Sequence, residues 1–285
     1  MRIFVDSADI DQIKESYSWG IVDGITTNPS LIKKAVENAK KKGDQASLET
    51  QIERILAVAG DTPVSLEVIG TTEKEMTEQG LFLFERFNKI ANNVVVKIPV
   101  NSGLEANARV RFDALKTIKT LADRHIPVNT TLIFTPEQAM LAAKAGARYV
   151  SPFAGRIDDD LRGKYKLPGS KTDYYPVDGT KLGEAVGGGD ADDYAHDNGM
   201  RSGVQLIEEC VQLFANYGFD CEVLAASLRN PRQVRECALA GADVATIPFD
   251  VLQLMLEHHK TVEGMKAFVA DIVPEYVDLF RKGVK

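Results

Sequence analysis

The chain has 285 residues, of which 44% are hydrophobic and 26% are charged, and its formal net charge is −7 at pH 7. This size and composition are typical of one large or two small globular domains with enough apolar residues for a core. The negative charge argues against nucleic acid or an anionic membrane as the main partner, and we expect neither, although a local basic pocket for phosphate is compatible with it.

Four strands are expected in the first half of the chain. The strands are β-branched runs at residues 3–6, 24–28, 63–68 and 94–100, each bounded by turn residues. Helical sequence lies between them. Ser7 is the expected N-cap of the first helix. Asn28 followed by Pro29 has the usual order of an N-cap and a first helical residue.

The second half continues the alternation. Further strands are expected at residues 127–134, 148–153, 222–227 and 244–247. Ala-Gly-Ala precedes two of them, as a weak internal repeat with each glycine at an expected helix end. Eight strands alternating with helices predict a closed (β/α)8 barrel, a TIM barrel, formed by residues 1–285 as one domain. An open doubly wound sheet is the alternative, but no Gly-x-Gly-x-x-Gly follows the first strand.

A long segment interrupts this rhythm after the sixth strand. Residues 158–201 are rich in Gly, Asp and Tyr and contain three consecutive aspartates at 158–160 and a Gly-Gly-Gly-Asp-Ala-Asp-Asp run at 187–193. Neither a phosphate loop nor a calcium loop is present, and a solvated insertion is favoured over a metal site. Because the insertion follows a strand end, a lid over the mouth of the barrel is the second hypothesis.

A helix is expected at residues 263–283, after the eighth strand. Its apolar residues form a stripe at helical spacing, and Pro274 is expected to kink or restart it. Such a helix packs either on its own barrel or on a neighbouring copy.

Three cysteines and the N-terminus bear on the cellular compartment. Cys210, Cys221 and Cys237 have no metal-ligand spacing and leave one residue over in any disulfide scheme, so reduced thiols are expected. The chain enters its first strand directly after Met1 without the pattern of a signal peptide, and no apolar run is long enough to cross a membrane. We expect a cytoplasmic protein.

Lys97 lies within the apolar run at residues 94–100, which is typical of a strand buried on both faces. Burial disfavours the charged form of an amine, so a lysine at the mouth of such a strand is a candidate for a neutral amine that attacks carbonyl groups. Taken alone, Lys97 is more simply a lysine that reaches water from the strand end.

Polar residues at the other strand ends change that judgement. The carboxyl ends of barrel strands meet on one face, so these residues are expected to lie together whatever their separation in sequence. They are Asp6, Asn28, Glu67, Lys97, Asn129, Thr131, Ser151, Ser227 and Arg229. Each has an ordinary structural interpretation: Asp6 and Asn28 as helix caps, Glu67 as a charge at a loop edge and Thr131 as an ordinary strand residue. Arg156, which follows the sixth strand, could likewise be a surface partner of Asp158 or Asp159. Jointly, those interpretations require polar residues to end nearly every strand by accident.

The chain resembles the transaldolase family, in the compact branch that also contains fructose-6-phosphate aldolases. The matching motifs run in order from the first strand to the seventh and cover nearly the whole chain: FVD at 4–6, TTNPSL at 26–31, SLEV at 65–68, VVKIP at 95–99, NTTL at 129–132, SPFAGRI at 151–157 and ASLR at 226–229. Residues 158–201 are longer than is usual in this branch, and the resemblance implies no role for them. Leu228 also departs from the family, where phenylalanine is common.

The resemblance implies a role for each matching residue. Lys97 is the Schiff-base lysine, Glu67 moves protons through a water held by Thr131, and Asp6 takes the proton of the C4 hydroxyl group. The implied substrate-binding residues are Asn28, Asn129, Ser151, Phe153, Arg156, Ser227 and Arg229. Of these, Arg156, Ser227 and Arg229 are implied to bind the terminal phosphate. No metal or organic cofactor is implied.

Three functions follow as hypotheses. Glu67 and Phe153 stand where the family's transferases have glutamate and phenylalanine, and its aldolases glutamine and tyrosine, so transaldolase is the leading hypothesis. It implies transfer of a dihydroxyacetone unit from fructose 6-phosphate or sedoheptulose 7-phosphate to an aldose phosphate, in the non-oxidative pentose phosphate pathway. A fructose-6-phosphate aldolase and a non-catalytic sugar-phosphate-binding barrel are the alternatives. The resemblance also implies a homo-oligomer, as a pentamer or decamer.

Overall fold

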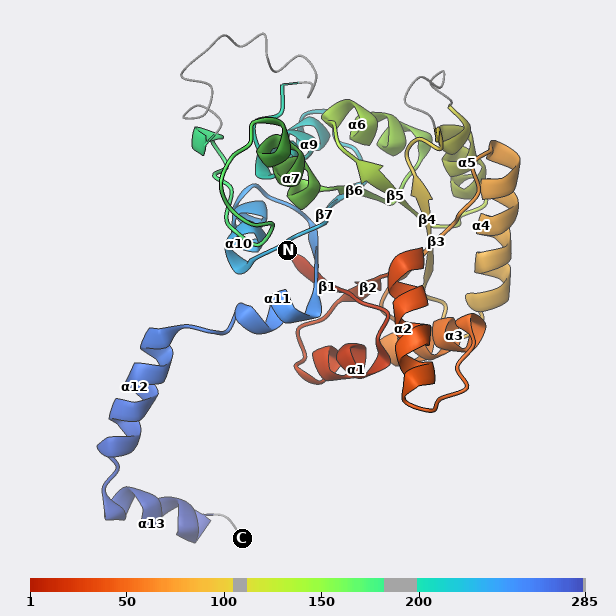
Figure 1. Cartoon of the computed structure of the whole chain (residues 1–285). Coiled ribbons are helices and arrows are strands. Elements are labelled where there is room, and N and C mark those ends of the chain that lie inside the picture. Colours follow the sequence, from red (N-terminus) through yellow and green to blue (C-terminus); the bar gives the residue numbers. More distant parts are fainter. Residues whose placement is uncertain (105–111, 182–198, 284–285) are drawn as a thin grey trace.

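The computed structural model describes residues 1–104, 112–181 and 199–283 and contains a closed barrel of eight parallel strands (Figure 1). Each strand pairs with its neighbours in sequence, and β1 closes the barrel against β8. The strands are β1 (Arg2–Asp6), β2 (Gly24–Thr26), β3 (Val64–Glu67), β4 (Val94–Pro99), β5 (Val128–Ile133), β6 (Tyr149–Pro152), β7 (Glu222–Ala225) and β8 (Val244–Ile247). The predicted (β/α)8 fold is confirmed, and the open sheet is excluded.

Helices surround the barrel. They are α1 (Ile10–Ser18), α2 (Pro29–Lys41), α3 (Leu48–Ala59), α4 (Glu73–Phe87), α5 (Asp113–Ala122), α6 (Pro136–Ala145), α7 (Ala154–Lys164), α9 (Gly203–Tyr217), α10 (Pro231–Leu239) and α11 (Phe249–Leu254). Asn28 caps α2 as predicted, accepting a hydrogen bond from the Leu31 N–H. The cap predicted for the first helix is wrong: Asp9 caps α1, because the Ser7 hydroxyl instead bonds the Asp9 N–H and Gln12.

Strand parity decides which side chains enter the barrel. Alternate residues of a strand point to opposite faces, and on β4 the side chains of Val94, Val96 and Ile98 join the core beneath the helices. Val95 belongs to a separate cluster inside the barrel, with Phe4 of β1 among its other members. Lys97 therefore points inward, two residues after Val95.

The long segment is only partly an excursion from the barrel. Helix α7 continues to Lys164, so residues 158–164 of the predicted insertion are helical, and Asp158 is buried against α9 and α10. Residues 165–181 follow α7 without a long helix. The glycine-rich run at 187–193 lies outside the described residues.

The C-terminal segment leaves the barrel as an arm of two helices, α12 (His259–Ala270) and α13 (Pro274–Gly283) (Figure 1). Where one helix was expected over residues 263–283, Pro274 begins a second one, because proline lacks an N–H and its ring clashes with a preceding helical turn. No residue of α12 is buried. None of the described helices has the length and apolar character needed to span a membrane.

Candidate active site

A pocket of about 160 Å³ lies at the carboxyl ends of the strands. It brings together most of the predicted site residues, namely Asp6, Asn28, Lys97, Ser151, Phe153, Arg156, Ser227 and Arg229. Glu67, Asn129 and Thr131 are not part of its lining but lie on β3 and β5, next to the lysine strand. The barrel thus gathers groups that are far apart in sequence into one polar mouth.

Lys97 is 6% exposed, and its amine is held by two oxygens. Its Nζ donates a hydrogen bond of 3.0 Å to the Thr27 carbonyl oxygen and lies 3.3 Å from Glu67 Oε2. The pairing of β3 with β4 sets Glu67 directly opposite Lys97. Burial raises the pKa of the Glu67 carboxyl group, and the neighbouring Lys97 opposes that rise. The pair can therefore exchange a proton over a short distance.

Asp6 supplies a second carboxylate on the inner face of β1. Its Oδ1 accepts a hydrogen bond of 2.8 Å from the Thr26 hydroxyl, which also contacts the Thr246 hydroxyl. Burial raises the pKa of Asp6, while Lys97 and the Thr26 hydrogen bond act in the opposite direction. Asp6 is not a helix cap, since Asp9 caps α1. Among the described residues, only its Oδ1 accepts a side-chain hydrogen bond.

A chain of amide and hydroxyl groups crosses β3, β5 and β6. Ser151 Oγ donates to Asn129 Oδ1 at 2.7 Å, and Asn129 Nδ2 donates to Ser65 Oγ at 3.0 Å. Thr131 Oγ1 is buried and has no hydrogen-bond partner among the described residues. Buried hydroxyl groups are normally paired, so Thr131 has capacity for a further partner.

Basic groups gather at the side of the pocket formed by α7 and the loop after β7. The Arg156 guanidinium lies 5.1 Å from the centre of the Phe153 ring, and Arg229 Nη2 lies 3.0 Å from Asp159 Oδ2. Ser227 has a φ of 62°, an uncommon and strained value for a residue other than glycine, and strained backbone of this kind is enriched at functional sites.

Gly155 of α7 permits the close approach of the loop after β7, which carries Ser227 and Arg229. A Cβ atom at position 155 would lie 2.0 Å from the Ser227 carbonyl oxygen, which is far inside van der Waals contact. The glycine is therefore required for the close packing that sets Ser227 and Arg229 beside Arg156.

Three further hydroxyl groups belong to the site but were not predicted: Thr26 contacts Asp6, Ser65 contacts Asn129, and Thr246 contacts Thr26. Their positions in the strands could have identified them. Each lies on the inward parity of its strand, where a polar residue is unusual inside a barrel packed with apolar side chains.

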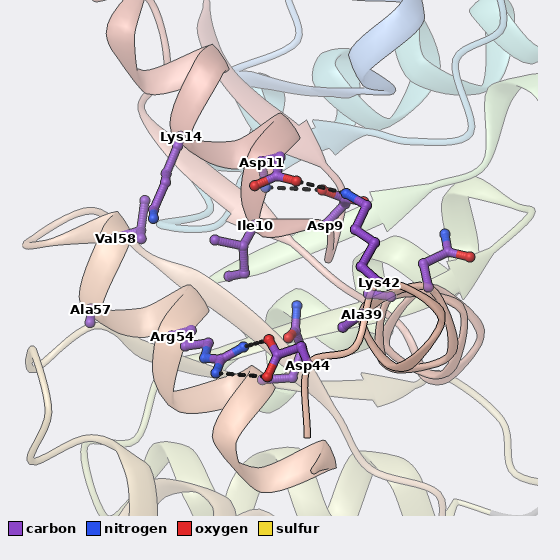
Figure 2. A pocket seen from close by; sticks show the side chains of 13 residues that line it. Asp9, Ile10, Asp11, Lys14, Ala39, Lys42, Asp44, Arg54, Ala57 and Val58 are labelled. Carbon is purple, nitrogen blue, oxygen red and sulfur yellow. Dashed lines mark hydrogen bonds and ion pairs between the residues drawn. The ribbon is translucent and has the colours of Figure 1, made fainter. Parts of the chain in front are cut away.

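A larger cavity of about 530 Å³ lies outside the barrel, between α1, α2 and α3 (Figure 2). Four of its charged side chains form two ion pairs: Lys42 Nζ lies 2.8 Å from Asp11 Oδ2, and Arg54 bonds Asp44. This cavity lacks the buried amine and carboxyl pair of the strand-end pocket, which is the better candidate for chemistry.

The fold and its strand-end site place the protein in the class of (β/α)8-barrel proteins with a buried lysine and carboxylate pair at the mouth. A model of the family described as Transaldolase/Fructose-6-phosphate aldolase matches residues 3–284. The chain therefore belongs to the transaldolase/fructose-6-phosphate aldolase family, and the resemblance seen in its motifs is confirmed.

Similar proteins support the same conclusion. A probable transaldolase of Thermoplasma acidophilum is 40% identical over 271 residues, covering 95% of each chain. A probable transaldolase of Desulfatibacillum aliphaticivorans is also 40% identical, over 95% of this chain and 97% of the relative. One from Thermoplasma volcanium is 37% identical over 95% of each chain. The protein is thus an enzyme of the transaldolase family.

Proposed function

We propose that this protein is a transaldolase that moves a dihydroxyacetone unit from a ketose phosphate, fructose 6-phosphate or sedoheptulose 7-phosphate, to an aldose phosphate. The observation that carries the proposal is the buried contact of 3.3 Å between Lys97 Nζ and Glu67 Oε2. A buried amine next to a carboxyl group of raised pKa is suited to the formation of a Schiff base.

The first step needs a neutral amine. Transfer of a proton from the Lys97 ammonium to Glu67 leaves an amine that adds to the C2 ketone of the substrate. The resulting carbinolamine loses water when Glu67 returns a proton to the leaving oxygen, and an iminium forms. Thr131, whose buried hydroxyl has no protein partner among the described residues, holds the water that relays this proton.

The second step breaks the bond between C3 and C4. Asp6 removes the proton of the C4 hydroxyl group, the bonding electrons flow to the iminium, and an aldose phosphate leaves. The enamine that stays on Lys97 then adds to the aldehyde of an acceptor by the reverse steps. Hydrolysis from Lys97 releases the new ketose phosphate, and no metal or organic cofactor takes part.

Binding groups surround this chemistry. Asn28 and Ser151 hold hydroxyl groups of the dihydroxyacetone unit, with Asn129 behind Ser151. Arg156, Ser227 and Arg229 bind the terminal phosphate, and arginine suits this role because its guanidinium binds phosphate in a bidentate manner.

Glu67 and Phe153 favour transfer over release. Phe153 packs with Phe134 at a ring distance of 5.8 Å and beneath Arg156, and it brings no hydroxyl group into the pocket. A fructose-6-phosphate aldolase using the same lysine is the second candidate. It would release free dihydroxyacetone without an acceptor.

The wider setting is part of the same proposal. We place the enzyme in the non-oxidative pentose phosphate pathway of the cytoplasm, as a homo-oligomer with the pentameric or decameric assembly of its family. The exposed apolar residues of the C-terminal arm support an assembly of several copies.

Borohydride reduction in the presence of fructose 6-phosphate tests the proposal. We expect intact-mass analysis and peptide mapping to find a reduced three-carbon adduct on Lys97. The Lys97→Met variant, matched in length and lacking the amine, should form none. A separate reaction without borohydride, to which erythrose 4-phosphate is added, distinguishes the two candidates, because a transaldolase converts it to a seven-carbon ketose phosphate. Folded, ligand-bound protein without an adduct would favour the non-catalytic sugar-phosphate-binding barrel.

A further inference from the structure

The described part of the long segment reaches the proposed phosphate site. Two of its residues contact the start of α10: Asn230 Nδ2 donates to the Thr172 carbonyl oxygen at 3.1 Å, and the Arg232 guanidinium lies 3.9 Å from the centre of the Tyr174 ring. Asn230 is also the N-cap of α10, directly after Arg229. The segment is thereby held beside the loop that carries Ser227 and Arg229.

Lys171 belongs to this segment and lies near Asp159. Its Nζ is 3.8 Å from Asp159 Oδ2, the same oxygen that lies 3.0 Å from Arg229 Nη2. Asp159 Oδ1 is buried without a hydrogen-bond partner among the described residues. Two cations thus share one oxygen of a carboxylate whose side chain is only 19% exposed.

The two arginines of the proposed phosphate site differ in their partners. Among the residues that the structure describes, no carboxylate lies within 4.0 Å of the Arg156 guanidinium, whereas Asp159 engages Arg229. A carboxylate and a phosphate compete for the same N–H groups of a guanidinium. A phosphate that binds Arg229 therefore displaces the Asp159 carboxylate from the guanidinium. Without another partner, Asp159 would then be an unpaired negative charge beside the negatively charged phosphate.

We propose that Lys171 strengthens the binding of phosphate esters and acts through Asp159. When the phosphate binds Arg229, the Asp159 carboxylate leaves Arg229 and pairs with Lys171 alone, so its negative charge stays neutralised. Lys171 is a positioning residue in this scheme and does not touch the substrate. The inference rests on the proposed function, because it takes Arg229 as a phosphate ligand.

Calorimetric titration with sorbitol 6-phosphate tests this exchange in the full chain. Sorbitol 6-phosphate has no carbonyl group and cannot react with Lys97, so its binding is independent of the Schiff-base chemistry. We expect Lys171→Met to raise the Kd about two- to fivefold, the range for an exposed ion pair. Lys171→Arg should restore the wild-type value. Lys166→Met, with the same loss of charge in the same segment, should leave it unchanged.

The Asp159→Asn variant tests whether Lys171 acts through Asp159. It should bind sorbitol 6-phosphate more tightly than the wild type, since Arg229 no longer has a competing carboxylate. In that background, Lys171→Met should have no further effect, because Lys171 acts only through Asp159. Thermal unfolding of each variant verifies that it is folded.

Three results would overturn the exchange. They are weaker binding by Asp159→Asn, an effect of Lys171→Met that persists in the Asp159→Asn background, and an unchanged Kd for the single Lys171→Met variant. A wild-type protein that fails to bind sorbitol 6-phosphate contradicts the proposed phosphate site itself. Wild-type binding that is indifferent to Lys171 contradicts only the inference.

Discussion

Asp158 and Asp159 are neighbours in sequence but lie in different environments. Asp159 pairs with Arg229 of the pocket. Asp158 is 2% exposed and accepts hydrogen bonds from the Gly203 N–H at 2.7 Å and from Gln233 Nε2 at 2.8 Å. Gln233 Oε1 in turn accepts from the Arg229 N–H at 2.8 Å. Asp158 therefore supports, at one remove, the backbone that carries Arg229.

Burial dominates the titration of Asp158. It raises the pKa of this carboxyl group to about 7, although both hydrogen bonds act in the opposite direction. The pKa of an aspartate in an unfolded chain is about 3.9. The raised value means that the stabilising contribution of the protonated form is complete below pH ~4 and is lost as the pH rises through ~7.

The Asp158→Asn variant should lack this pH dependence. Between pH 4 and 7, we expect the free energy of unfolding of the wild type to fall, relative to that of the variant, by on the order of 2–4 kcal/mol. Urea unfolding at a series of pH values measures the difference. Asp160→Asn, a change at an exposed neighbour, is the control. Parallel pH profiles for the wild type and Asp158→Asn would contradict the burial argument.

At the scale of elements, the arm formed by α12 and α13 contrasts with the helices around the barrel. Helix α3 buries Ile52, Ile55 and Leu56, whereas the apolar residues of the arm are exposed. They include Phe268, Val269, Ile272, Val273, Tyr276, Val277 and Phe280. Exposed apolar residues in this number are typical of a surface that contacts another protein, because their exposure to water is unfavourable.

If the arm holds copies together as proposed, its truncation should reduce the size of the oligomer. We expect a chain truncated before Glu263 to have a lower mass by light scattering than the intact protein. A full-length Phe268→Ser variant tests the same surface without shortening the chain. If both proteins keep the mass of the wild type, the arm does not hold copies together, and another surface must account for any oligomer.

At the scale of the whole molecule, the three cysteines report on the integrity of the barrel. Cys210, Cys221 and Cys237 are unpaired and buried. Burial raises the pKa of Cys221 to about 12 and also raises the pKa values of Cys210 and Cys237. Since the thiolate is the reactive form, these thiols are protected twice, by lack of access and by protonation.

Their reaction with Ellman's reagent should therefore follow unfolding. We expect negligible labelling of the native protein at pH 7 and labelling of all three thiols in denaturing urea. The rate should rise with urea in step with the loss of helical circular dichroism. A thiol that reacts rapidly while the circular dichroism is native would show that its part of the barrel opens separately.

The local features of this fold were readable from the sequence because each depends on neighbouring residues. β-branched runs bounded by turn residues indicated the strands, Asn28 and Pro29 indicated the start of α2, and eight alternations of strand and helix indicated the barrel. The same reasoning predicted that polar residues would share the mouth, since parallel strands end on one face. The Ser7 cap was wrong because Ser, Asp and Asn caps within three residues are nearly equivalent from sequence alone.

Contacts across the barrel were decided by the tertiary structure. The sequence by itself determined the class of fold, the family motifs and which residues end the strands. The pairing register set Glu67 opposite Lys97, and closure of β1 against β8 brought the hydroxyl groups of Thr26 and Thr246 together. The sharing of Asp159 between Arg229 and Lys171 likewise depends on how α7, the loop after β7 and the long segment pack. Such contacts join residues far apart in the chain, and local periodicity carries no information about their distances.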